Sequence, residues 1–505
     1  MTSITTTDRF YSLWRNRYIR DCIRCNVWRN RVINTTLEYL DDNYRYLSLF
    51  AFNDRIEYNI AIHLKINKRD TLIAYVNNKH KELIDSIFID YDIDVTLLPP
   101  LDHTPLQTNQ QTVLQQQQQR ELLQQSKVLR FDCSLFHQGL RSLSFFILNQ
   151  HTVGSGKPLP DSITKLNIYS RFRFEMGNIV VDSILAHLPS RLRSLTLPNG
   201  LVINTPTCAI PDTLEYFNYG STHENLKGFV VPPGKRFGKC VLKIKTNQDL
   251  EWVTQHTWVH KVSFLIGFEP TAHTLASHIT HIDFEFIDGK LEKGMLPISL
   301  INLSIYQYDE PLEVGVLPSG LQDLMLETYD YPLEQGHLPD SLTALCLGSY
   351  NLPIKPHVLP NNLTRLTMDS FDQEIQANTL PRSLKYLDIS VFDESFEHVG
   401  PLDNLIELTV DDLHESVATL LQNVRTIEIR TNQISGNVYL KDTAIQNLDI
   451  HSANRFSLYP GFLPSSVKKI IMKGFDIKMD NLIPQSCVYL KTDIVEHQTD
   501  SFVKY

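Results

Sequence analysis

The sequence of 505 residues has no apolar run long enough to cross a bilayer, and its first residues lack the apolar core of a secretory signal. Its seven cysteines are scattered and odd in number, so they form no disulfide framework. We therefore expect reduced thiols, no membrane association, and a location in the cytoplasm or the nucleus. The formal net charge of −10 argues against nucleic-acid binding.

Motifs for catalysis and metal binding are also missing. The sequence contains no GxSxG or HExxH motif and no dinucleotide fingerprint, so we predict no enzyme activity and no cofactor. An enzyme without a known motif would need a deep pocket with converging titratable groups. His281 and Asp283 are two residues apart, and Cys22 and Cys25 form a lone CxxC. Such isolated pairs are weak signals, and we predict no metal site.

A repeat is the strongest feature that is present. A Leu-Pro pair recurs five times in steps of 21 residues, at Leu296, Leu317, Leu338, Leu359 and Leu380. After each proline, apolar residues follow at the third, sixth and eighth positions. These residues are Leu300, Leu303 and Ile305; Leu321, Leu324 and Leu326; Leu342, Leu345 and Leu347; Leu363, Leu366 and Met368; and Leu384, Leu387 and Ile389.

The last two apolar positions of each copy are two residues apart, so they lie on one face of a short strand. One copy cannot bury these side chains alone, whereas stacked copies bury them against each other and form a parallel ladder. A period of 21 lies in the range of leucine-rich repeats. Proline and glycine after the strands exclude long helices there. We predict a mainly β repeat solenoid with a parallel, leucine-rich-repeat-like ladder.

Two segments that follow these units carry a more specific motif. They are Tyr331-Pro332-Leu333-Glu334-Gln335-Gly336 and Tyr350-Asn351-Leu352-Pro353-Ile354. The combination resembles the FNIP repeat, a short relative of the leucine-rich repeat named for a Phe-Asn-Ile-Pro motif, from about Lys290 to about Ile389. Tyr350 stands in place of Phe, and the turn from Phe371 to Ile375 has no proline. The resemblance implies a solenoid used for interactions and implies no chemistry.

The same apolar pattern, without the regular Leu-Pro marker, extends on both sides of these five copies. It begins by Leu140 and gives about sixteen strands from Pro160 onward. We divide the chain into residues 1–98, an N-terminal arginine-rich helix with a small α/β cap; residues 99–126, a glutamine-rich low-complexity loop; residues 127–490, the solenoid; and residues 491–505, a C-terminal cap or tail.

The N-terminal segment supports two interpretations. An apolar stripe predicts a helix from Asp8 to about Ile33, and seven arginines surround it: Arg9, Arg15, Arg17, Arg20, Arg24, Arg29 and Arg31. The helix either caps the solenoid or docks an acidic partner. One form of docking is a degenerate F-box-like segment, which would make the protein a substrate-recognition subunit of a ubiquitin ligase.

The rest of the cap is predicted as a strand, a helix and a second strand. The strand covers Arg45–Phe52, the helix covers Asp70–Leu83 with Asp70 as its N-cap, and the second strand covers Ser86–Asp90. Such a cap covers the first strand of a solenoid, which otherwise exposes an open edge.

Residues that alternate with the core positions are expected to face outward on the ladder. Acidic and tyrosine side chains dominate these positions: Asp283, Glu285, Tyr306, Asp323, Glu327, Asp369, Tyr386, Asp388, Glu407, Asp411 and Glu428. They predict a negative surface for a basic peptide or protein, with Tyr306 and Tyr386 as anchors. The alternative is an ordinary solvated face. The predicted function is a protein-binding scaffold; the sequence specifies neither the partner nor the oligomeric state.

Overall fold

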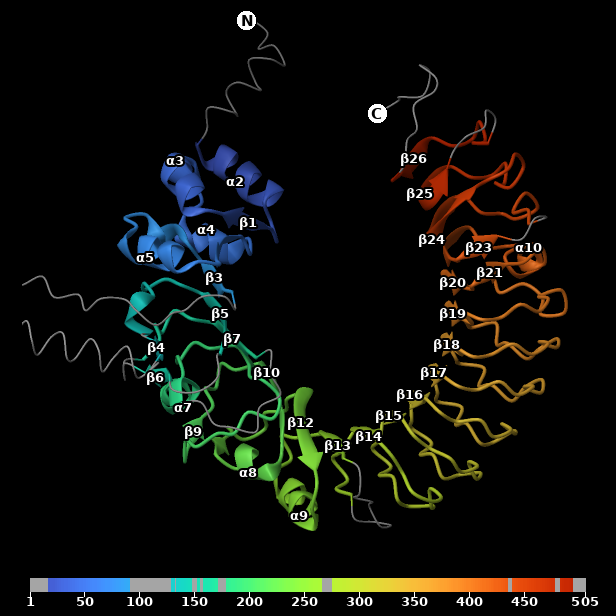
Figure 1. The fold of residues 1–505 in the computed structure, drawn as a ribbon, viewed down its shortest axis with the longest axis horizontal. Helices are drawn as coiled ribbons and strands as arrows, with labels where there is room; N and C mark the ends of the chain where they lie inside the picture. Colours follow the sequence, from blue (N-terminus) through green and yellow to red (C-terminus); the bar gives the residue numbers. More distant parts are fainter. Residues whose placement is uncertain are drawn as a thin grey trace, which may run out of the picture. The chain divides into compact units, whose positions relative to one another are not determined.

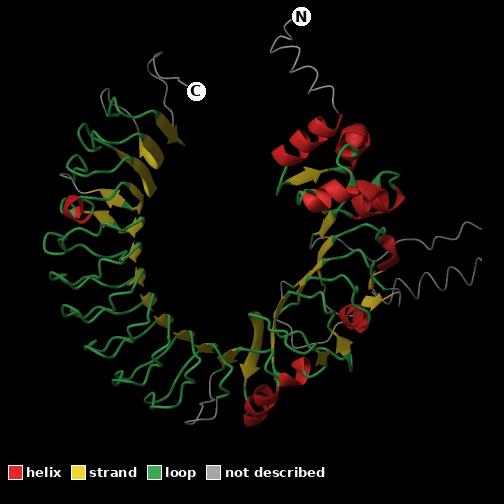
Figure 2. Ribbon diagram, turned by 180° about the vertical axis from the view of Figure 1, so that it is seen from behind, coloured by secondary structure: helices red, strands yellow, loops and turns green. Residues whose placement is uncertain are grey.

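The computed structural model describes residues 17–90, 129–131, 133–147, 152–154, 158–170, 179–265, 275–434, 438–476 and 482–493. They belong to two compact units, Met1–Leu242 and Lys243–Tyr505. Each unit is a parallel β-solenoid, so the predicted fold class is confirmed (Figures 1 and 2). The glutamine-rich segment 99–126 and residues 494–505 lie outside the described residues.

Unit 1 combines a ladder with helices. Its strands pair in parallel, in chain order: β1 (Val32–Thr35), β2 (Ala61–Ile66), β3 (Ser86–Ile89), β5 (Ser142–Phe146), β7 (Lys165–Tyr169), β8 (Ser194–Thr196), β10 (Tyr216–Ser221) and β12 (Lys239–Ile244). The helices are α2 (Arg17–Val27), α3 (Leu37–Leu47), α4 (Phe52–Glu57), α5 (Arg69–Asn77), η1 (Lys81–Leu83), η2 (Cys133–Leu135), α7 (Ile179–Ala186) and α8 (His223–Leu226). Two-stranded side sheets join β4 (Leu129–Phe131) to β6 (Thr152–Gly154) and β9 (Cys208–Ala209) to β11 (Phe229–Val230).

Unit 2 is almost entirely strand and turn. Its ladder runs through β13 (Lys261–Phe264), β14 (His281–Phe284), β15 (Asn302–Ile305), β16 (Asp323–Leu326), β17 (Ala344–Leu347), β18 (Arg365–Thr367), β19 (Tyr386–Asp388), β20 (Glu407–Thr409), β22 (Thr426–Arg430), β24 (Asn447–Ser457), β25 (Lys469–Asp476) and β26 (Tyr489–Thr492). The helices are α9 (Asn247–Gln255) and α10 (Val417–Leu420), and β21 (Asp412–Leu413) pairs with β23 (Gln433–Ile434). Within this unit the strands lie along one side and the connecting turns along the other (Figure 2).

The core of unit 2 consists of columns of apolar side chains. Leu324, Leu345 and Leu366 lie opposite one another in adjacent strands and are at most 1% exposed. Because each leucine is covered by the equivalent residues of the turns before and after it, its burial contributes about 2 kcal/mol only when the turns are stacked. The predicted inward register is therefore confirmed for the central copies.

The Leu-Pro marker forms the turn before each strand. The carbonyl of Pro339 accepts the amide of Leu342 at 3.0 Å, and the other central copies repeat this bond. The serine two residues after the proline reaches the previous turn, since Ser341 Oγ donates to the carbonyl of Leu321 at 2.6 Å. Ser299 and Ser383 make the same bond in their copies, so these turns are joined to the preceding turn by a side chain as well as by the ladder.

A column of aromatic rings fills the turn side of unit 2. Tyr308, Tyr329 and Tyr350 stack with ring centroids 6.2 and 6.4 Å apart, and Phe371 and Phe392 continue at 6.3 Å. The next residue in each turn forms a second column of hydrogen bonds. Its members are Asp330, Asn351 and Asp372, whose side-chain Oδ1 atoms accept the amides of Asn351, Asp372 and Asp393 at 3.2, 2.9 and 2.9 Å.

Between β20 and β22 the apolar pattern shifts by two residues although the paired residues stay 21 apart (Leu408 and Ile429), whereas the irregular pairing of unit 2 lies between β24 and β25, after His451. Leu408 lies opposite Leu387 on one side, but opposite Ile429 on the other. In the repeat pattern, with apolar residues at positions three, six and eight, Leu408 is the residue at position six of its copy. Ile429, which lies opposite it, is the residue at position eight of the next copy, so the pattern is displaced by two residues. A shift of two keeps each side chain on its own face of the sheet, and Leu408, Ile427 and Ile429 all stay buried.

The predicted N-terminal elements needed correction. The first helix does not reach Ile33: α2 ends at Val27, Asn30 takes a positive φ of 58°, and Ile33 belongs to β1. Residues 8–16 lie outside the described residues. The segment Arg45–Phe52 is not a strand, because Thr36 caps α3 through the amide of Tyr39 and the helix continues to Leu47.

The helix predicted over Asp70–Leu83 is shorter and has a different N-cap. Its cap is Lys68 rather than Asp70, α5 ends at Asn77, and a separate 3₁₀ turn, η1, covers Lys81–Leu83. The strand predicted at Ser86–Asp90 is confirmed as β3, with Ile87 and Ile89 buried. β3 pairs directly with β5, so the ladder continues from the predicted cap into the predicted repeats.

The substitution Leu345→Asp tests the core register. It places a charge in the column between Leu324 and Leu366, and we expect the free energy of unfolding to fall by several kcal/mol, about the cost of a buried unpaired charge. Thr343→Asp, at an exposed position of the same turn, is expected to cost less than about 1 kcal/mol. Thermal and urea unfolding measure both, and equal stability of the two variants would refute the register.

Candidate protein-binding surface

The alternating residues of the unit 2 strands form one continuous surface, which we call the strand face. None of the eleven predicted residues is buried. Register places Asp323, Tyr386, Glu407 and Glu428 in one row and Asp283 and Asp388 in the next. The sequence therefore identified which side chains lie on this surface, while their charge balance depends on contacts between strands.

Cations neutralise both flanks of the predicted acidic stripe. Lys261 Nζ lies 2.9 Å from Asp283 Oδ2 on the neighbouring strand. Arg430 Nη2 lies 3.2 Å from Glu407 and 2.8 Å from Glu428, so one guanidinium serves two carboxylates. These partly exposed pairs contribute little stability, but they remove negative charge from three of the predicted positions.

The middle of the strand face keeps its charge. Asp323, Glu327, Asp369 and Asp388, which we call the acidic centre, surround Cys346. Burial, followed by the charges of Asp369, Glu327, Asp388 and Asp323, raises the pKa of the Cys346 thiol to about 11. The pKa of Asp369 is also raised, by burial and by the charge of Asp388. No cation is ion-paired with these four carboxylates in the described part of unit 2.

Local contacts hold the acidic centre in place. Asn302 Nδ2 donates to Asp323 at 3.0 Å, and Ser390 Oγ donates to Asp388 at 2.8 Å. Glu327 lies over Gly348, where an added Cβ would come within 2.7 Å of the Glu327 carboxylate carbon. Gly348 therefore provides the space that this side chain occupies, and the carboxylates are positioned before any ligand arrives.

The two predicted tyrosine anchors differ. Tyr306 is 49% exposed, whereas Tyr386 is half-buried under the Arg365 guanidinium, whose carbon lies 4.4 Å from the ring centroid. Glu285 and Asp411 are exposed, and Asp411 accepts the side-chain amide of Asn432 at 2.5 Å. The sequence reasoning missed Lys261, Arg365 and Arg430, although the 21-residue period was enough to place Arg365 beside Tyr386.

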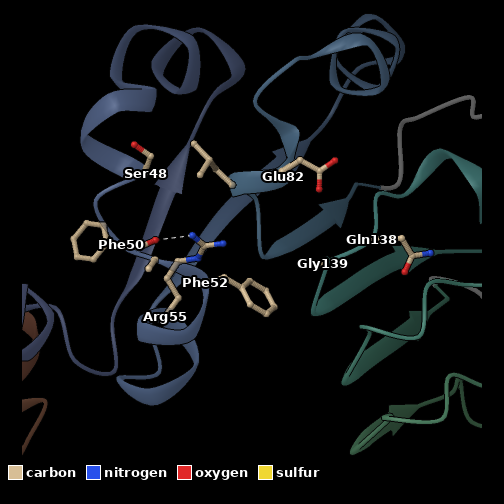
Figure 3. Close-up of a pocket in the computed structure, with 9 residues that line it drawn as sticks. Ser48, Phe50, Phe52, Arg55, Glu82, Gln138 and Gly139 are labelled. Atoms are coloured by element: carbon tan, nitrogen blue, oxygen red, sulfur yellow. Dashed lines mark hydrogen bonds between the residues drawn. The ribbon is translucent and has the colours of Figure 1, made fainter.

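A pocket of about 380 Å³ lies in unit 1, lined by Ser48, Phe50, Ala51, Phe52, Arg55, Glu82, Leu83, Gln138 and Gly139 (Figure 3). Arg55 supplies its main charge but is already engaged: Nε lies 2.8 Å from Asp85, and Nη1 donates to the carbonyl of Phe50 at 2.8 Å. Asp85 also accepts Arg141 at 3.1 Å. These bonds link β3 to the segments on either side of it, so the cluster has a structural role.

A second buried network lies beside this cluster. His137 Nδ1 is 2.7 Å from the hydroxyl of Tyr75, and Nε2 is 3.0 Å from the carbonyl of Ile84. Because a carbonyl only accepts, Nε2 carries the proton and Nδ1 accepts from Tyr75. Burial lowers the pKa of His137 and of His63 below the ordinary value of 6.5.

The arginine-rich helix packs part of its charge inward. Arg24 Nη2 bonds to Asp21 at 2.9 Å and to the carbonyl of Leu49 at 2.5 Å. Cys25 is buried against Phe50 and Ile60, and burial is the main cause that raises the pKa of its thiol. Within the described residues, no group of three or more His, Cys, Asp or Glu side chains is arranged to hold a metal.

Comparison with known families identifies the repeats. The model of the FNIP repeat family matches residues 288–329, 308–350, 329–368 and 350–392. The chain contains FNIP repeats. The aromatic residue of the FNIP motif is the one that stacks in the aromatic column, and the following Asn or Asp is the one that bonds to the next turn.

The FNIP repeats include the whole acidic centre, from Asp323 to Asp388.

A comparison with curated proteins gave no match. Among the described residues, no helix is both long enough and apolar enough to cross a membrane.

The two buried histidines predict a pH-dependent stability of unit 1. Since their pKa values are lower in the folded state, the unfolded chain binds more protons below about pH 6.5, and stability is expected to fall as the pH drops from 7.5 to 5.5. Hydrogen exchange of the β2 and β3 amides at several pH values measures this. The double variant His63→Gln, His137→Gln is expected to flatten the dependence, whereas His357→Gln, at an exposed position, leaves it unchanged.

Proposed function

We propose that this protein is a non-enzymatic scaffold that binds another protein through the strand face of unit 2, and that the acidic centre holds the Lys or Arg side chains of a basic segment. The observation that carries this proposal is a set of four carboxylates on neighbouring strands with which, among the described residues, no cation forms an ion pair. Burial and the neighbouring charge of Asp388 raise the pKa of Asp369, and a bound cation would favour its charged form.

The dimensions of the acidic centre suit an extended segment. Its residues come from β16 to β19 and the turns that follow these strands, a span of about 14 Å at roughly 4.8 Å per strand. An extended chain covers this distance with about four residues. Tyr306, one strand away, supplies an exposed ring for an apolar or cationic side chain next to the basic segment.

The location that we propose is the cytoplasm or the nucleus. The support is that all seven cysteines are free thiols, and four of them are buried. We also propose that no cofactor takes part, because recognition by a rigid charged surface needs none.

A charge-neutralising variant tests the acidic centre. With Asp323→Asn, Glu327→Gln, Asp369→Asn and Asp388→Asn combined, we expect affinity purification and mass spectrometry to lose a basic partner that the intact chain retains. The binding of that partner should also weaken as salt rises. The matched control changes four exposed acids away from the acidic centre: Glu292→Gln, Glu394→Gln, Glu397→Gln and Glu415→Gln. An unchanged partner set in the first variant would exclude the acidic centre as the binding surface.

A second candidate function is a substrate-recognition subunit of a ubiquitin ligase that docks through the N-terminal helices. Its support is an unusual concentration of exposed apolar side chains. Nine of the 21 exposed large hydrophobic residues among the described residues fall between positions 23 and 56: Ile23, Val27, Trp28, Val32, Tyr39, Tyr46, Leu49, Phe52 and Ile56. Such clusters commonly mark interfaces, and the exposed Arg20 and Arg29 beside them favour an acidic partner.

Two serine substitutions on α2 test this docking. Ile23→Ser and Val27→Ser, on one exposed face of the helix, are expected to remove co-purifying ligase subunits without unfolding unit 1. Ile298→Ser and Val314→Ser, at exposed positions of unit 2, serve as the control and should retain them. If the intact chain brings down no ligase subunit, the second candidate fails.

A further inference from the structure

β26 (Tyr489–Thr492) is the last strand of the unit 2 ladder among the described residues. β26 pairs with β25 in parallel, with Leu490 opposite Ile470. In earlier turns the amide of a core residue donates to the next strand, as Met368 does to the carbonyl of Asp388 at 2.8 Å and Ile389 does to Thr409 at 3.0 Å. Leu490 occupies a core position of this kind, and no strand follows β26 in the described residues. Its amide and carbonyl therefore face outward.

The apolar core is uncovered at the same place. Ile470 is 0% exposed, whereas Leu490, the next residue of the same column, is 42% exposed. Tyr489 and Val488 beside it are 49% and 84% exposed. The first strand of unit 1 is different, because Cys25 of α2 packs with Phe50 and Ile60, and Ile33 of β1 packs against them.

Lysine side chains lie near the edge of β26, Lys491 on β26 itself and Lys469 and Lys473 on β25, and the exposed Asp493 follows β26. Lys469, Lys473 and Lys491 are all exposed on the last two strands of the ladder. Lys469 Nζ lies 5.5 Å from the centre of the Tyr489 ring. No ion pair engages these three lysines in the part of the chain that the structure describes.

We propose that the open edge of β26 binds an acidic peptide segment in an extended conformation, which adds to the ladder as a further strand. The backbone of the segment bonds to Leu490. Its apolar side chains cover the exposed end of the Leu490 column, and its alternate carboxylates lie beside Lys491, with Lys469 and Lys473 one strand farther away on β25. Strand addition of this kind takes affinity from backbone hydrogen bonds and specificity from alternate side chains. An open, apolar strand edge favours a peptide over a nucleic acid, which has no backbone amides to pair.

This site is independent of the acidic centre. It has the opposite charge, lies on other strands, and selects the opposite kind of partner. The failure of either proposal leaves the other intact.

A designed peptide tests the proposal on the full chain. The probe is a fluorescein-labelled peptide of alternating glutamate and valine, eight residues long, and its binding is measured by fluorescence anisotropy. We expect binding together with slower hydrogen exchange at the Leu490 amide. A peptide with proline in place of the two central valines keeps its charge but loses backbone donors, and we expect it to bind at least about tenfold more weakly.

Protein variants test the role of charge. The combination Lys469→Gln, Lys473→Gln and Lys491→Gln is expected to weaken the peptide by about tenfold. The control combination Lys355→Gln, Lys385→Gln and Lys441→Gln, at exposed sites elsewhere in unit 2, should have no effect.

Three results would overturn the proposal. The first is equal binding of the proline peptide, or an unprotected Leu490 amide, because the edge would then not pair. The second is tighter binding of a single-stranded DNA dodecamer, because the lysines would then recognise polyanions in general. The third is binding only after residues 494–505 are removed, because the chain itself would then occupy the edge.

Discussion

Every other property of the two solenoids depends on the mutual burial of equivalent side chains in successive turns. A single turn has too little apolar surface to offset the entropy of ordering its backbone, and it becomes stable only when the turn before and the turn after cover its leucines. This requirement fixes the strand register. The register in turn fixes which residues face outward and how far apart they lie. The acidic centre is therefore a consequence of packing on the opposite face of the same strands.

The fold was predictable from the sequence where the chain repeats itself. Leu324, Leu345 and Leu366 recur at a constant period, so a single hypothesis about one turn is supported by all of them. The segment around Arg45 offered only local evidence. Its short alternation of apolar and polar residues resembled a strand, but the Thr36 cap and the spacing of Leu40 and Leu47 place it in a helix. One local pattern without a second copy cannot distinguish a period of two from a period of 3.6.

The candidate surface was predictable in membership but not in charge. Alternation was enough to place Asp283 and Glu407 on the strand face. Their ion pairs with Lys261 and Arg430 join residues 22 and 23 positions apart, since the partners lie on adjacent strands. The exposure of Leu490 was likewise not predicted, because residues 491–505 were expected to form a cap or a tail. Which carboxylates are ion-paired and which core residues are buried depends on contacts with neighbouring turns, and the sequence of one turn does not specify these contacts.

The two-residue step between Leu408 and Ile429 has an evolutionary consequence. A solenoid that grows by duplication accumulates insertions and deletions, and most of them fall in turns, where extra residues loop out without changing the strands. Within a strand the outcome depends on parity. An odd change exchanges the buried and solvated faces for the remainder of that strand, whereas an even change only displaces the pairing. The spacing after Ile389 is consistent with this rule, because the paired residues of β20, β22 and β24 stay 21 apart (Glu407 and Glu428, Thr426 and Asn447) while the apolar pattern around them shifts by an even number of residues.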